Sequence, residues 1–162
     1  MAPSPLRESR DSLHRNVLRW SMELRKNGMR GTFAYGMVQA CWTLVQSLLH
    51  GAAEVAVATT PASAFVVARE TNGGDLDGLT LGQLFAVIDG CNRLLLPAGQ
   101  EFMSEDDRLR ISRLIRYRNK STHDEYTQHL ERSLEFLTLV SDVASSAMLE
   151  LLLERERTRP LR

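Results

Sequence analysis

Apolar residues recur along most of this chain at the three- and four-residue intervals of amphipathic helices, and this pattern predicts an all-α protein. The stretch from Arg7 to about Lys26 has a loose apolar stripe and an arginine-rich polar face, and Asn27-Gly28 ends it. The stretch from Thr32 to roughly Val57 is apolar over a wide face, which predicts a central bundle helix. Thr59-Thr60-Pro61 ends that helix, because the residue before a proline is disfavoured in helical space.

The middle of the chain is less regular. Ala62 to Glu70 is compatible with either a short helix or an extended packing segment. Residues 72–78 are turn formers and predict a loop. Thr80-Leu81-Gly82-Gln83 then has the pattern of a capping box, which predicts a helix that runs on to Pro97.

Two further helix starts follow the same logic. Ser104-Glu105-Asp106-Asp107 predicts the start of a cationic helix, and Thr122-His123-Asp124-Glu125 predicts the start of one last helix that continues to Leu152. The expected architecture is a four- to five-helix up-and-down bundle. We expect a single domain over residues 1–162, with 1–6 and 156–162 frayed.

Composition narrows the function classes. Twenty basic residues balance twenty acidic ones, so an RNA partner would need a local cationic patch. Cys41 and Cys91 lie far apart without a ligand or disulfide pattern and are interpreted as core residues, and no metal site or cofactor is expected. The N-terminus has no signal-peptide core and the apolar runs are interrupted, so a cytoplasmic protein without a membrane span is expected.

The local cationic patch is found in the second half of the chain. Arginines and Lys120 occur from Arg108 onward without an acidic residue before Asp124. Within this run, Arg118 falls in the last turn of one predicted helix and His123 in the first turn of the next, so a short connector brings both to one end of the bundle. The positive potential at a helix N-terminus disfavours the imidazolium form of His123, and a neutral imidazole suits a general base. In this arrangement, Arg118 would hold an anion beside it. The alternative is that Arg118 caps a helix C-terminus and His123 is an ordinary first-turn residue.

Four residues separate Arg118 from His123, and polar Asn119 directly follows the arginine. This pattern resembles the motif of the HEPN superfamily. Most members of that superfamily are RNA-cleaving or RNA-binding helical bundles. The opening Thr80-Leu81-Gly82-x-Leu84 is similar to what many members carry at the same place in the helix order. The resemblance covers roughly Thr32 to Glu154. Tyr126 departs from one toxin branch, whose AMP-modified tyrosine stands one residue closer to the histidine.

The resemblance implies a metal-independent endoribonuclease that works as a homodimer with a composite active site. Arg118 and His123 would be catalytic, Asn119 would be a supporting polar residue, and Arg113, Arg116 and Lys120 would contact RNA. It also implies a toxin or anti-phage setting, with an antitoxin or sensor protein as a further partner. Two alternatives stay open: a non-catalytic HEPN-like module that binds RNA or protein, and a purely structural helical adaptor.

Overall fold

The structure, a computed structural model, describes residues 4–27, 31–71, 75–94, 99, 101–121 and 130–158. Side chains are described for these residues except 27, 31–35, 70, 119–121 and 130–133. Helices are the only regular secondary structure among the described residues, which confirms the all-α prediction. The helices are α1 (Pro5–Asn27), α2 (Gly31–Thr59), α3 (Ser63–Glu70), α4 (Leu81–Leu94), α5 (Glu105–Ser121), α6 (Leu130–Ala144) and α7 (Ala147–Thr158).

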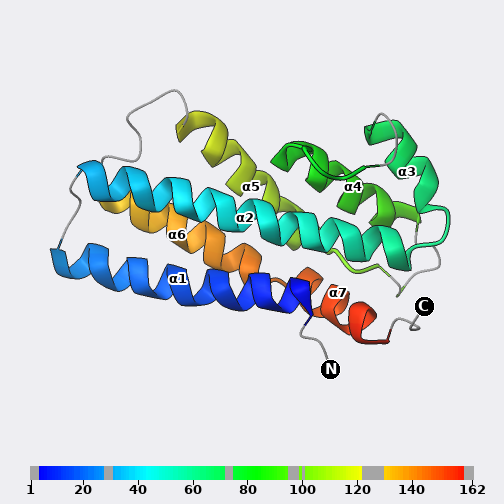
Figure 1. Ribbon diagram of the computed structural model, residues 1–162, viewed down its shortest axis with the longest axis horizontal. Helices are drawn as coiled ribbons and strands as arrows, with labels where there is room; N and C mark the ends of the chain where they lie inside the picture. Colours follow the sequence, from blue (N-terminus) through cyan, green and yellow to red (C-terminus); the bar gives the residue numbers. More distant parts are fainter. Residues whose placement is uncertain are drawn as a thin grey trace.

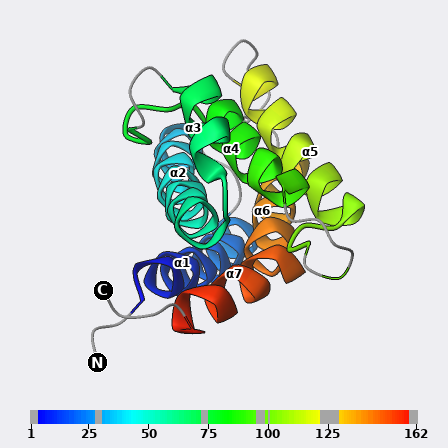
Figure 2. The same cartoon turned by 90° about the vertical axis from the view of Figure 1, so that its right-hand side faces the viewer.

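Helices α1, α2 and α6 run side by side along the long axis of the molecule (Figure 1). Helix α5 crosses over α6, and α3 and α4 pack on the C-terminal half of α2. Figure 2 looks along the bundle and shows α2 between the α3–α4 pair and the α1–α7 side. The buried side chains of these helices form one continuous hydrophobic core, in which Leu48, Ile88 and Phe136 are fully buried.

The first helix begins earlier than the sequence predicts. Helix α1 starts at Pro5, a residue type favoured in the first turn, and Ser4 Oγ accepts a hydrogen bond from Arg7 N at 3.1 Å. Leu6 is fully buried, and its side chain lies against Gly51 near the end of α2. Burial of Leu6 therefore fixes the start of α1, where the sequence predicts a frayed end.

The capping box predicted before α4 is confirmed. Gln83 N donates to Thr80 Oγ1 at 3.2 Å, and Thr80 N donates to Gln83 Oε1 at 2.9 Å. At the start of α5, Asp107 N donates to Ser104 Oγ at 3.1 Å, which is the first half of the box predicted there. The carboxylate of Asp107 accepts a hydrogen bond from Met148 N, at the start of α7, at 3.0 Å.

The prediction of one uninterrupted last helix is wrong. The described part of this segment divides at Ser145-Ser146 into α6 and α7. Ser146 N donates to Val143 O at 3.2 Å, a tightened last turn, and the next helix begins with Asp107 as an external cap. The predicted start of this segment at Thr122 lies outside the described residues. The expected count of four to five helices is not confirmed, since the segment is split and α3 is a helix of its own.

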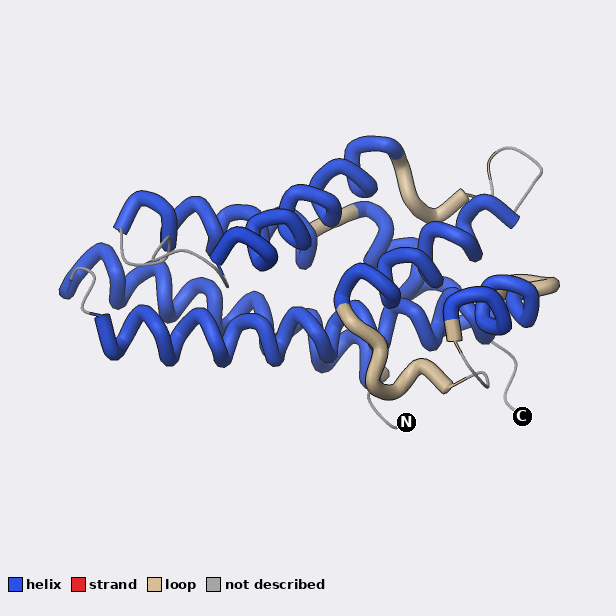
Figure 3. The backbone as a smooth tube through the Cα atoms, turned by 90° about the horizontal axis from the view of Figure 1, so that it is seen from above, coloured by secondary structure: helices blue, strands red, loops and turns tan. Residues whose placement is uncertain are grey.

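Figure 3 shows the described helices and the loops between them from above. Helix α3 packs mainly on α4 and also contacts α2. Its start is unusual because Ala62 has a positive φ of 62°, a conformation that costs an alanine about 1 kcal/mol or more. Contact with α4 holds α3 in place. Gly90 on α4 lies so close to Val66 that a Cβ there would be 2.8 Å from Val66 Cγ1.

Among the described residues, the segment Leu134–Thr158, which includes most of α6 and all of α7, is by length and composition long and apolar enough to cross a membrane. Of its most apolar window, 56% is buried inside the bundle, against helices that include α1, α2 and α5. Packing in the core accounts for this apolar character.

Candidate active site

The residues of the Arg-x4-His motif start in the last turn of α5. Arg118, Asn119 and Lys120 belong to this helix, which ends at Ser121. Arg118 is exposed to solvent. The side chains of Asn119 and Lys120, and the whole of His123, lie outside the described residues. The described part of the candidate site is therefore Arg118 and the helices that support it.

Three aromatic side chains support the end of α5. Tyr117 is buried and stacks on Phe136 of α6, with ring centroids 5.3 Å apart and planes inclined by 12°. Phe136 in turn packs at a tilt against Trp42 of α2, with centroids 4.7 Å apart. Aromatic pairs in these arrangements add about 0.5–1.5 kcal/mol each beyond the area they bury. The cluster therefore joins α2, α5 and α6 directly beneath the predicted site.

Arg118 stands over this aromatic cluster. Its guanidinium carbon lies 6.0 Å from the centroid of the Trp42 ring, at the outer limit of a cation–π contact. Trp42 is itself half-buried, so its ring belongs partly to the core and partly to the surface. The sequence does not predict this contact. Trp42 restrains the position of Arg118 while the guanidinium keeps its positive charge at the surface.

The other predicted RNA-binding residues lie on a different side of the helix. Arg113 and Arg116 are both exposed on α5. Successive helical residues are about 100° apart, so Arg118 is displaced by about 140° from Arg113 and about 160° from Arg116. The same register places position 120 beside Arg113 and Arg116. Within one chain, the structure brings Arg113 and Arg116 together and separates them from Arg118.

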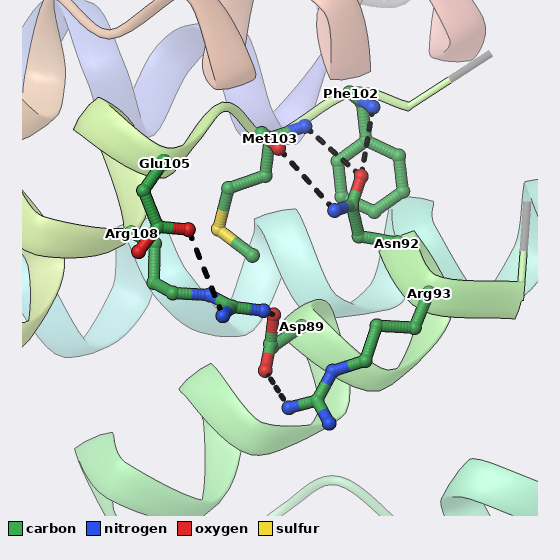
Figure 4. A network of polar contacts seen from close by, with 7 residues as sticks. All are labelled: Asp89, Asn92, Arg93, Phe102, Met103, Glu105 and Arg108. Atoms are coloured by element: carbon green, nitrogen blue, oxygen red, sulfur yellow. Dashed lines mark hydrogen bonds and ion pairs between the residues drawn. The ribbon is translucent and has the colours of Figure 1, made fainter. Parts of the chain in front are cut away.

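The N-terminal part of the cationic run has structural partners (Figure 4). Arg108 and Arg93 both pair with the carboxylate of Asp89, whose side chain is 7% exposed, and Arg108 also approaches Glu105 Oε2 at 3.8 Å. Of these pairs, Arg108–Asp89 joins α5 to α4. Arg110 lies 3.9 Å from Asp107 Oδ1. The sequence does not predict Asp89 as a buried anion, although its i, i+4 spacing to Arg93 is a local signal.

Asn92 provides the second part of this network. Its Oδ1 accepts from Phe102 N at 2.9 Å and from Met103 N at 3.1 Å, and its Nδ2 donates to Met103 O at 3.3 Å. All three residues are buried. The Asn92 side chain therefore satisfies three buried backbone hydrogen-bonding groups just before α5, and it fixes where that helix begins.

No group of three or more metal-ligating side chains occurs within the part of the chain that the structure describes. His50 has Glu54 Oε1 at 3.1 Å from one ring nitrogen and Asp77 Oδ1 at 2.9 Å from the other. These contacts point to opposite sides of the ring and tie the loop before α4 to α2. Burial raises the pKa of Cys41 to about 12 and that of Cys91 to about 11, so both are neutral thiols in the core, as predicted.

Comparison with known proteins gives no relative. No family model, curated protein or solved structure matches this chain.

Proposed function

We propose that this protein is a metal-independent endoribonuclease of the HEPN type, with Arg118 and His123 as its catalytic pair. The observation that carries the proposal is the position of Arg118, an exposed guanidinium in the last turn of α5, restrained by Trp42. In the sequence, His123 follows two residues after the end of α5 at Ser121, and it is proposed to lie beside Arg118. Asn119 is proposed as a supporting polar residue.

The proposed reaction uses the RNA as its own nucleophile. Neutral His123 removes the proton from a ribose 2′-hydroxyl, and the oxygen attacks the adjacent phosphorus. Arg118 stabilises the negative charge that gathers on the phosphorus oxygens. The bond to the 5′-oxygen breaks, and this oxygen takes a proton. The products are a 2′,3′-cyclic phosphate and a 5′-hydroxyl.

Arg113 and Arg116, with Lys120 by helical register, are proposed to contact phosphates on either side of the cleaved bond. Because they lie on a different side of α5 from Arg118, one RNA strand reaches both only by passing around the end of the helix. A homodimer offers a second route, in which the arginines of one protomer flank the Arg118 of its partner. Each phosphate contact contributes a salt-dependent share of the affinity.

The experiment that tests this function is incubation of the purified protein with total RNA in EDTA, followed by mapping of the product ends. Cyclic-phosphate 3′ ends that disappear in a His123→Ala variant support the proposal. His14→Ala is the matched control, since His14 is a half-buried histidine on α1. Cleavage that requires magnesium, or that survives His123→Ala, contradicts it.

The separation of Arg113 and Arg116 from Arg118 also favours a second candidate, a non-catalytic module that binds RNA. This module retains salt-dependent RNA affinity, produces no cleavage, and loses affinity in an Arg113→Gln/Arg116→Gln variant. A structural adaptor, by contrast, has no RNA affinity at any salt concentration. A toxin or anti-phage role, with an antitoxin or sensor as partner, belongs to the first proposal.

A further inference from the structure

The outward face of α1 combines basic and apolar side chains. Five exposed positions from Arg15 to Lys26 share one face within about 100° of arc, and exposed Glu8 falls on the same arc nearer the start of the helix. We call the five positions the α1 stripe, which consists of Arg15, Leu18, Arg19, Met22 and Lys26. Figure 2 shows α1 at the edge of the bundle, with its other side against the neighbouring helices.

The apolar residues of the stripe are not part of the core. Leu18 is 65% exposed and Met22 is 62% exposed, whereas Leu13, Val17 and Leu24 on the inner side of α1 are buried. Single exposed apolar residues are common on protein surfaces. Here two of them stand one helical turn apart, so they offer one continuous apolar strip.

In the described part of the chain, the cations of the stripe form no ion pairs. No carboxylate among the described residues pairs with Arg15 or Arg19, and Arg19 donates instead to Asn16 Oδ1 at 2.7 Å. The nearby Asp11 lies 3.7 Å from Arg10. Arg15 and Arg19 therefore place positive charge beside the apolar strip without a direct ion pair to any described carboxylate, although exposed Glu23 lies one turn after Arg19.

We infer that the α1 stripe binds an acidic amphipathic helix of another protein. Such a helix places apolar side chains against Leu18 and Met22 and carboxylates against Arg15, Arg19 and Lys26. A second copy of this chain fits poorly, because a twofold contact through the stripe sets arginines against arginines. RNA fits poorly as well, since two aliphatic side chains provide no stacking surface for a base. A lipid surface fits poorly, because the larger apolar face of α1 is occupied by the bundle.

The test uses the full chain and a designed probe. The probe is a helical peptide of about 20 residues with leucines along one face and glutamates beside them, compared with a scrambled peptide of the same composition. We expect the patterned peptide to bind at least about tenfold more tightly than the scrambled one, and its affinity to fall as salt is raised.

Two double variants separate the contributions. Leu18→Ser/Met22→Ser and Arg15→Glu/Arg19→Glu should each weaken peptide binding at least about tenfold, with unfolding curves like that of the wild type. Phe65→Ser is the matched control, because it removes a 77% exposed aromatic side chain from α3 and should leave the affinity unchanged.

Several results overturn the inference. One is equal affinity for the patterned and scrambled peptides, or an affinity that the two double variants leave intact. Another is binding to phosphatidylglycerol vesicles, or to a single-stranded oligonucleotide, that depends on Leu18 and Met22 while peptide binding does not. A third is a dimer that becomes monomeric in Leu18→Ser/Met22→Ser, which would assign the stripe to a second copy of the chain.

Discussion

Arg118 lies with its guanidinium carbon 6.0 Å from the centre of the Trp42 ring, and this contact joins the last turn of α5 to α2. Trp42 also packs on Phe136, which stacks on Tyr117, the residue before Arg118. The aromatic cluster therefore supports the position of Arg118 from below. If Arg118 takes part in RNA cleavage, Trp42 is a positioning residue for the reaction.

Replacing Trp42 by leucine should slow RNA cleavage about 2- to 5-fold, because a cation–π contact at an exposed site contributes about 0.5–1 kcal/mol. Trp42→Phe keeps an aromatic ring and should retain most of the rate. Single-turnover cleavage at saturating protein measures the effect. Trp20→Leu is the control: Trp20 is buried on α1, so its loss should lower stability without changing the cleavage rate of the folded protein. Equal rate losses in the Trp42 and Trp20 variants would contradict the positioning role.

Gly90→Ala should destabilise the protein by about 1–2 kcal/mol. An alanine Cβ would lie 2.8 Å from Val66 Cγ1, and this overlap outweighs the gain of about 1 kcal/mol in helix propensity. In a Val66→Ala background the same change should become neutral or stabilising. Gly82→Ala is the matched control on the same helix and should not destabilise, because a Cβ there would come no closer than 3.9 Å to Thr80 Oγ1. Urea unfolding measures all four variants, and a Gly90→Ala protein as stable as the wild type would refute the close approach of α3 and α4.

Asn92→Ala should cost about 2–4 kcal/mol of unfolding free energy, because it leaves the buried N–H groups of Phe102 and Met103 without their acceptor. The loss should concentrate in the segment before α5, where hydrogen exchange of these two amides should accelerate. Thr138→Ala removes an exposed hydroxyl that donates to Leu134 O at 2.9 Å, and it should change stability by less than about 0.5 kcal/mol. Similar losses in both variants would count against a special role of Asn92.

The two cysteines should resist alkylation at pH 8 in the native protein and react on unfolding. Burial raises the pKa of Cys41 to about 12. Burial also raises the pKa of Cys91, to about 11, and outweighs the Thr60 hydroxyl and the Arg155 charge, which both lower it. Because both values lie above that of an unfolded thiol, about 8.5, the stability linked to the neutral thiols is fully present below that pH. It is lost as the pH rises toward 11 and 12. Iodoacetamide labelling followed by mass spectrometry checks the first part, and rapid native labelling of Cys41 would contradict its burial.

Local signals in the sequence are sufficient where the interaction is itself local. The Thr80–Gln83 capping box is an example, since both hydrogen bonds connect residues three positions apart. The break between α6 and α7 is different, because the apolar repeat continues across Ser145-Ser146 and the start of α7 depends on Asp107, which is distant in the sequence. Helix α3 is similar, since its apolar residues are compatible with two structures until Val66 packs against Gly90.

The candidate site shows the same division. The placement of Arg118 at the end of a helix follows from the pattern of the sequence and is found in the structure. Its contact with Trp42 depends on how α2 and α5 pack, which no spacing within α5 specifies. The division of the arginines between two sides of α5 does follow from helical periodicity alone. The number of cations in this part of the sequence does not show that division, because residues close in the sequence can lie on opposite sides of a helix.

The central claim is that Arg118 and His123 act in the same step of RNA cleavage. The most direct test is the single-turnover cleavage rate, in EDTA, of wild type, Arg118→Ala, His123→Ala and the double variant. We predict that each single change slows cleavage about 100-fold or more, and that the double variant is no slower than the slower single variant, because two groups that act as a unit are not additive. Rates that multiply in the double variant, or a single variant that cleaves like the wild type, would contradict the account.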